Sequence, residues 1–166
     1  MTFVPETEVR ESVARLFSRI ERQLRELLPG AEIEHVGSTA IPGCLTKGDL
    51  DIQVRVSTEA YAAARRKLAE LYEINEGGFA ADDATSFEDY STEPPHGVHL
   101  TVINGSCDIQ WRFRDAIRAS GELRQEYDEF KRRFEGRPAK AYRDAKCDFV
   151  LRVEESAAYP RADRDG

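Results

Sequence analysis

The first part of the chain carries apolar residues at helical spacing. They recur every three or four residues from Val9 to Leu28, which predicts an amphipathic helix over about residues 6–28. Pro29-Gly30 ends this helix. Residues 31–36 then alternate between apolar and polar side chains, which predicts a strand. Residues 37–48 form a turn-rich link in which a short helix opens at Ser38 or Thr39.

Strict alternation returns over residues 49–56. One face of this predicted strand is apolar and the other is polar. The apolar face carries Leu50, Ile52, Val54 and Val56, and the polar face carries Asp49, Asp51, Gln53 and Arg55. We expect Thr58 to cap a following helix that runs to about Leu71.

The remaining pattern is mixed and then helical. Residues 73–84 are typical of a loop with a short strand, and 86–91 and 99–103 are typical of strands. Three helices are predicted after the turn signal Asn104-Gly105, over 107–119, 121–134 and 138–157. Helices packed on a small mixed sheet give the class α/β (α+β), with one domain over 1–157 and a polar tail over 158–166.

Composition narrows the class of protein. The 166 residues are 40% hydrophobic and 33% charged, as in a soluble globular domain. No apolar run is long enough to cross a membrane, and the N-terminus resembles no signal peptide. Three widely spaced cysteines suit free thiols in a reducing cytoplasm. We therefore expect a cytoplasmic protein with no membrane association.

Charge is distributed unevenly along the chain. The net charge is −7, which argues against a general affinity for nucleic acids. Residues 1–106 hold 10 basic and 18 acidic residues, whereas 107–156 hold 12 basic and 11 acidic ones. Solvated helix faces explain this asymmetry most simply. It also fits a site in which carboxylates bind a cation and basic groups face phosphates.

The aspartates of the 49–56 strand suggest a specific chemistry. Residues i and i+2 of a strand point the same way, about 7 Å apart, and two carboxylates there repel unless a cation lies between them. Mg²⁺, or Mn²⁺ in its place, prefers oxygen ligands and completes its shell with water and phosphates. Asp49 and Asp51 are therefore candidate metal ligands, although the pair taken alone is more simply explained by a solvated strand face.

Gly37-Ser38 supplies the complementary feature. Ten residues lie between Ser38 and Asp49. A turn led by glycine lets the backbone approach a phosphate closely, and amides at a following helix N-terminus favour its negative charge. Together, the turn and the aspartates predict a site that holds a nucleoside triphosphate against two metal ions.

Longer segments then carry a family resemblance. They are IEHVGSTAIPG (33–43), DIQV (51–54), HLTVI (99–103), FRDAIRASGELRQEYDEFKRRF (113–134) and AYRDAKCDFV (141–150). With these segments the chain resembles the GrpB (glutamate-rich protein B) family, which is placed in the nucleotidyltransferase superfamily of polymerase-beta-like fold. The resemblance covers about residues 31–155. It implies a minimal nucleotidyltransferase fold with a helical C-terminal part.

The resemblance also implies roles for individual residues. Asp49 and Asp51 would bridge two metal ions as the catalytic carboxylates, and Gly37 and Ser38 would hold the triphosphate. Lys47 or Lys146 would neutralise phosphate charge. The implied reaction is magnesium-dependent transfer of a nucleoside monophosphate from a nucleoside triphosphate to a hydroxyl of a small molecule or a protein.

Two departures from the family pattern qualify this activity. The family usually has an apolar residue at the position of Asp49, so this chain has a fuller acidic pair. Active nucleotidyltransferases carry a third carboxylate on a later strand, but the predicted 99–103 strand offers only His99 and Thr101 on one face.

Three alternatives therefore stay open. His99 is a candidate metal ligand or base at the position that lacks an acid. The second alternative is that the chain is a catalytically degenerate module that binds a nucleotide or a partner. A zinc site made of His96, His99 and Cys107 is the third alternative, which the strand geometry disfavours because positions three apart face opposite ways.

Overall fold

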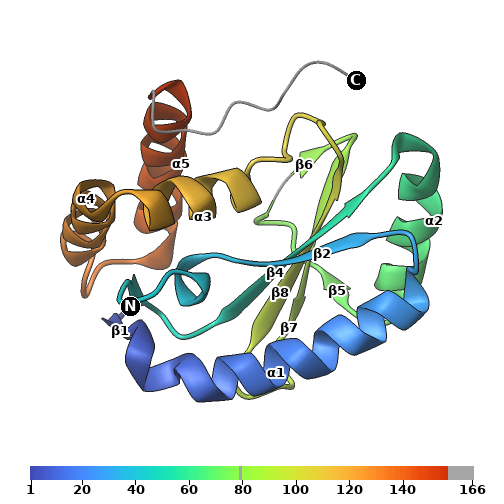
Figure 1. The fold of residues 1–166 in the computed structure, drawn as a ribbon, viewed down its shortest axis with the longest axis horizontal. Coiled ribbons are helices and arrows are strands. Elements are labelled where there is room, and N and C mark those ends of the chain that lie inside the picture. The colour runs from blue at the N-terminus through green and yellow to red at the C-terminus, as the bar shows by residue number, and fades with distance from the viewer. Residues whose placement is uncertain (79, 157–166) are drawn as a thin grey trace.

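The computed structural model describes residues 1–78 and 80–156. A mixed sheet lies at its centre, and Figure 1 shows helices on both sides of it. The strands, in order across the sheet, are β2 (Glu32–Val36), β4 (Leu50–Val56), β8 (His96–Val102), β7 (Ala84–Asp89) and β5 (Glu73–Ile74), with β6 (Ala80–Ala81) also paired to β7. Only the β4–β8 pair is parallel among them. The predicted α+β class with a small mixed sheet is confirmed.

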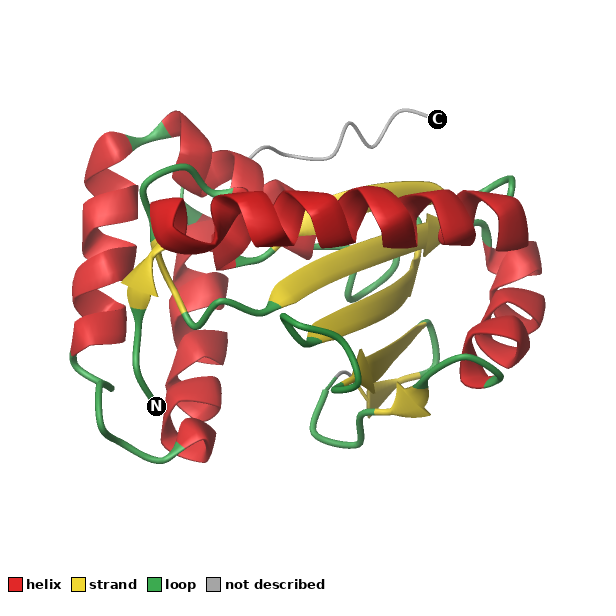
Figure 2. Ribbon diagram, turned by 90° about the horizontal axis from the view of Figure 1, so that it is seen from below, coloured by secondary structure: helices red, strands yellow, loops and turns green. Residues whose placement is uncertain are grey.

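Five helices surround the sheet in the described part of the chain. They are α1 (Glu6–Leu27), α2 (Thr58–Ala69), α3 (Gln110–Ala119), α4 (Gly121–Arg132) and α5 (Ala139–Glu155). Figure 2 shows α1 running along the sheet, with α2 beyond its far end and the C-terminal helices grouped at the other. The N-terminus lies beside this C-terminal group, where the ring of Phe3 contacts that of Tyr142 at 5.6 Å.

The main hydrophobic core lies between α1, α2 and one face of the sheet. Among the strands, β4 contributes most to this core, and its apolar side chains Leu50, Ile52, Val54 and Val56 are buried there as predicted. Burial of this alternating set fixes the register of β4, because a slip of one residue would turn the aspartate face inward.

A second, smaller core forms among α3, α4, α5 and the link that follows β2. It includes Ile41, Phe113, Tyr127 and Phe149. The segment between β2 and β4 therefore runs between two cores. This position holds the segment that carries the Gly-Ser turn.

Some predicted boundaries were wrong. The cap of α2 is Ser57, whose hydroxyl accepts from the Ala60 amide, and not Thr58. β8 begins at His96 rather than at residue 99, because pairing with β4 and β7 extends it through Gly97 despite the low strand propensity of glycine. The two-residue strands β1 (Val4–Pro5) and β3 (Leu45–Thr46) pair with each other and were not predicted. The predicted tail at 158–166, like residue 157, lies outside the described residues.

Candidate functional site

The predicted phosphate turn lies directly against Asp51. β2 and β4 pair so that Val36 faces Asp51, which brings Gly37 next to the Asp51 side chain. Gly37 has a φ of +73°, and a Cβ atom there would stand 2.4 Å from Asp51 Oδ2. Both the backbone conformation and this close approach therefore require glycine.

The helix expected after this turn is short. Residues Ser38–Ala40 form a single turn of 3₁₀ helix. One turn cannot supply the macrodipole of a full α-helix. Phosphate binding here would therefore depend on individual amides, on the Ser38 hydroxyl and on nearby cations.

Asp51 is the best-defined acid of the site. Its side chain is 30% exposed, and its Oδ1 lies 3.3 Å from Nε2 of His99. Burial would raise the pKa of Asp51, but hydrogen bonding to His99 and the charges of His99, Lys146 and Lys47 outweigh burial and lower it. Asp51 is therefore a carboxylate at neutral pH. Gly97 faces Asp51 across the β4–β8 pair, where a Cβ atom would stand 3.3 Å from Asp51 Oδ1 and 3.4 Å from His99 Nε2.

Asp49 is held differently from Asp51. It precedes β4, and its Oδ2 lies 3.0 Å from Nζ of Lys47. Within residues 1–78 and 80–156, no three His, Cys, Asp or Glu side chains are grouped closely enough to hold a metal ion. Neither the predicted set Asp49, Asp51 and His99 nor the alternative zinc set is therefore assembled as a ligand group.

Lys146 comes to this site from a distant part of the sequence. α5 carries it to the seam between the two cores, where its charge interacts with Tyr127, Asp51 and Asp49. The negative charge that Tyr127 can carry raises the pKa of Lys146 most, burial opposes this effect, and the two aspartates add to it. Ser38 in turn contributes to lowering the pKa of Tyr127. A cation, the Gly-Ser turn and Asp51 are thus neighbours in space.

Arginines from the C-terminal helices hold the link by its backbone. The Arg118 guanidinium donates to the Ala40 carbonyl at 2.8 and 2.5 Å, and Arg114 donates to the His35 carbonyl at 2.7 Å. Arg124 donates to the Pro42 carbonyl at 3.2 Å. These contacts were missed in the sequence, where the same basic residues are typical of solvated helix faces.

His35 connects the turn to the start of β4. Its Nε2 lies 3.0 Å from Oγ1 of Thr39, and that hydroxyl donates to the Asp49 carbonyl at 3.2 Å. The His35 ring stacks on Phe17 of α1. Burial lowers the pKa of His35 to about 4, so the ring is neutral at pH 7.

The other end of the polar face of β4 is closed. Arg55 donates from Nε and one terminal nitrogen to the two carboxylate oxygens of Asp108, at 2.7 and 2.8 Å. Gln53 donates to the same carboxylate and accepts from the Trp111 amide of α3. Asp108 is therefore committed to Arg55 and does not replace the missing third acid.

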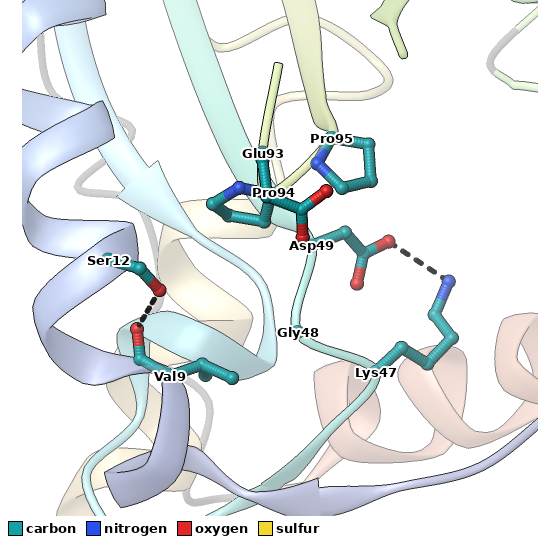
Figure 3. Close-up of a pocket in the computed structure, with 8 residues that line it drawn as sticks. All are labelled: Val9, Ser12, Lys47, Gly48, Asp49, Glu93, Pro94 and Pro95. Atoms are coloured by element: carbon teal, nitrogen blue, oxygen red, sulfur yellow. Dashed lines mark hydrogen bonds and ion pairs between the residues drawn. The ribbon is translucent and has the colours of Figure 1, made fainter. Parts of the chain in front are cut away.

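A cavity opens beside Asp49, on the side of α1. Figure 3 shows it between the N-terminal half of α1 and the segment that leads into β8. Its volume is about 380 Å³, and it is lined by Val9, Ser12, Lys47, Gly48, Asp49, Glu93, Pro94 and Pro95. Sequence patterns gave no signal for this cavity, since its walls come from three separate segments.

Comparison with known proteins gives consistent results. The sequence profile described as GrpB protein matches residues 7–156. A UPF0157 protein of Vibrio cholerae is 31% identical over 156 residues, which cover 92% of this chain and 81% of that protein. A UPF0157 protein of Halalkalibacterium halodurans is 30% identical over 156 residues, with coverages of 86% and 76%.

Solved structures share the fold. The crystal structure of the conserved protein GrpB from Enterococcus faecalis superposes with a TM-score of 0.69 at 19% identity, covering 95% of this chain and 97% of that one. Cid1, an RNA terminal uridylyl transferase, has a TM-score of 0.53 at 13% identity, covering 77% of this chain and 40% of its own. A second Cid1 structure, of a mutant bound to MgATP, has a TM-score of 0.50 at 11% identity, with coverages of 74% and 40%. No helix in the described residues is both long and apolar enough to span a membrane.

Proposed function

The chain belongs to the GrpB family, and we propose that it is a magnesium-dependent nucleotidyltransferase. It would move a nucleoside monophosphate from a nucleoside triphosphate to a hydroxyl of a small molecule or a protein. One observation carries the proposal: Gly37 stands directly against Asp51, and the charge of Lys146, from a distant segment, lowers the pKa of the same carboxylate. This is the combination of close backbone, carboxylate and cation that a metal-bound triphosphate needs.

The donor chemistry of the site fits Mg²⁺. Asp51 is ionised and partly exposed, and Asp49 is a second carboxylate at the same end of β4. Two protein carboxylates suit Mg²⁺, which usually keeps several waters and binds substrate phosphates as well. When bound, Mg²⁺ would neutralise phosphate charge and increase the acidity of the acceptor hydroxyl. His99 Nε2 lies 3.3 Å from Asp51 Oδ1 and would orient this carboxylate.

Different residues of the chain would bind the phosphates and balance their charge. Gly37 and Ser38 would hold the terminal phosphates, and Lys146 and Lys47 would balance their charge as flexible point cations. The acceptor oxygen would form a bond to the α-phosphorus, and the bond from this phosphorus to the leaving pyrophosphate would break. The proton of the acceptor hydroxyl would pass to water.

The partners follow from the charge of the whole molecule. A net charge of −7 disfavours long nucleic acids as acceptors and favours a small molecule or a protein. We further propose that the protein acts in the cytoplasm. The nucleoside triphosphates of a cell are available there, and three free cysteines suit a reducing compartment.

A second candidate is a module of the same fold that binds a nucleotide or a partner without turnover. The observation in its favour is that β8 offers His99 and Thr101 where a third acid is expected, while Asp108 is held by Arg55. This candidate predicts binding of a nucleotide or of a partner protein, with no pyrophosphate release.

Calorimetric titration of ATP, CTP, GTP and UTP, each with and without Mg²⁺, tests both candidates. We expect magnesium-dependent binding of at least one nucleotide to the wild type and none to Asp51→Asn. Asp144→Asn, an exposed aspartate on α5, is the matched control and should bind normally. Failure of the folded wild type to bind any nucleotide would overturn the proposed enzyme.

Lys146 can be tested in the same titrations. Lys146→Gln should weaken nucleotide binding about tenfold, which corresponds to about 1.4 kcal/mol for one lost charge contact. Lys140→Gln, on the same helix but exposed and paired with Asp144, should change the affinity little. Equal affinities of the two variants would remove Lys146 from the site. Pyrophosphate release would then separate an enzyme from a binding module.

A further inference from the structure

The cavity beside Asp49 has features of a binding site that the nucleotide does not use. Its volume of about 380 Å³ is at the lower end of the range for small-molecule sites. It lies on the α1 side of the segment Lys47–Asp49 (Figure 3). Asp51, by contrast, shares its strand face with Gln53 and Arg55, which α3 covers.

The polar lining of the cavity accepts more hydrogen bonds than it donates. Asp49 and Glu93 contribute carboxylates, and the one cation of the lining, Lys47, already pairs with Asp49 at 3.0 Å. The Ser12 hydroxyl donates to the Val9 carbonyl at 2.9 Å, so its oxygen presents lone pairs. A ligand that brings its own donors, and above all a positive charge, would suit these groups best. Two carboxylates and one ammonium give the lining a net charge of −1, which disfavours a phosphate.

The rest of the lining is apolar. Val9, Pro94 and Pro95 provide hydrocarbon surface, and Gly48 adds backbone without a side chain. Such walls pack against the C–H faces of a compact ring or a short carbon chain. Apolar walls with a few polar groups are the usual construction of a site for a small molecule.

We propose that this cavity binds the acceptor and that the acceptor is a small polyhydroxylated amine, of the amino-sugar class. Its ammonium group would face Glu93, and its hydroxyl groups would face Ser12 and Asp49. Because Asp49 belongs to both the cavity and the acidic pair, a hydroxyl of the bound molecule would stand next to the proposed metal site. The role of the bound molecule as an acceptor rests on the proposed function. Its binding in the cavity does not.

Three probes of similar size test the inference. Glucosamine, glucose and gluconate, which are cationic, neutral and anionic at neutral pH, are titrated into ¹⁵N-labelled protein without nucleotide or Mg²⁺. We expect glucosamine to shift the amide resonances of Ser12, Gly48 and Glu93. Glucose should bind more weakly and gluconate weakest. The absence of these shifts with glucosamine, or an equal response to all three probes, would overturn the inference.

Substitutions test which negative charge of the cavity selects a cationic ligand. Glu93→Gln should weaken glucosamine binding about tenfold and leave glucose binding unchanged. Glu76→Gln makes the same change at an exposed residue outside the cavity and should affect neither probe. Equal glucosamine affinity of Glu93→Gln and the wild type would refute the charge-based assignment.

The inference and the proposed function can fail separately. Glucosamine binding in the cavity without any nucleotide binding would support the site and reject the transferase. Nucleotide binding without glucosamine binding would support the nucleotide site and reject the acceptor class. A protein acceptor would be the next candidate in that case.

Discussion

The two ends of the polar face of β4 contain similar residue types in opposite circumstances. At one end, Arg55 and Asp108 are 8% and 1% exposed and satisfy each other with two hydrogen bonds. At the other end, Asp49 and Asp51 remain partly exposed, with side chains 34% and 30% accessible. Helix α3 covers the first pair, whereas the second pair lies where the link between β2 and β4 joins β4.

This difference separates charges that stabilise the fold from charges that are available to a ligand. A buried bidentate ion pair is costly to break because either partner alone becomes an uncompensated charge. A partly exposed carboxylate beside cations has solvent as an alternative partner. Such a carboxylate can therefore bind a metal ion without destabilising the fold. Exposure, more than residue type, distinguishes the candidate site from the scaffold.

Substitution of one aspartate at each end should give the largest contrast. Asp108→Asn leaves Arg55 only its ion pair with the half-exposed carboxylate of Glu32 and should lower the free energy of unfolding by about 3 kcal/mol. Asp51→Asn should change it by less than about 1 kcal/mol, because the carboxylate is partly solvated. Urea denaturation of the two variants and the wild type measures both values. A similar loss of stability in the two variants would contradict the distinction between the ends.

As the pH falls, protonation of His35 should destabilise the region around Asp49 and Asp51 before Asp51 itself is protonated. The pKa of His35 is about 4 in the folded protein, against about 6.5 unfolded. A lowered folded pKa means that this stability is present above pH 6.5 and is lost as the pH falls towards 4. The difference corresponds to at most about 3 kcal/mol.

Denaturation of the wild type and His35→Gln at several pH values measures this contribution. The wild type should lose stability between pH 6.5 and 4 more steeply than the variant, in which the neutral amide does not titrate. Parallel pH profiles for the two proteins would show that His35 is not a buried neutral ring.

Two glycines that share the same φ give the smallest and most local contrast. Gly37 and Gly136 both have a φ of +73°, but a Cβ would meet Asp51 at Gly37 and nothing within 4 Å at Gly136. Gly136→Ala should cost about 1 kcal/mol from the backbone alone. Gly37→Ala should cost about 2 kcal/mol and also abolish magnesium-dependent nucleotide binding.

A double variant tests whether the extra cost comes from Asp51. In the background of Asp51→Ala, the cost of Gly37→Ala should fall, because the contact with Oδ2 is gone, but it should stay above that of Gly136→Ala, because the ψ of −173° at Gly37 still favours glycine. An unchanged cost would place the strain in the backbone and not against the carboxylate.

The sequence by itself determined the main elements and the family. Periodicity of 3.6 and of 2 identified the long helices and the inward face of β4 because burial acts on each element separately. It also located the Gly-Ser turn next to an acidic strand. The order of glycine and aspartate along the chain is a local signal. It can be recognised without knowing which other segments pack nearby.

Only the tertiary structure decided which polar residues are free to act. Alternation along β4 shows that one face is polar, but not that α3 buries Gln53 and Arg55 while leaving Asp51 open. Likewise, no local pattern brings Lys146 to Asp51 or assembles the cavity beside Asp49. These arrangements depend on side chains far apart in the chain, and only the packing of the two cores brings them together.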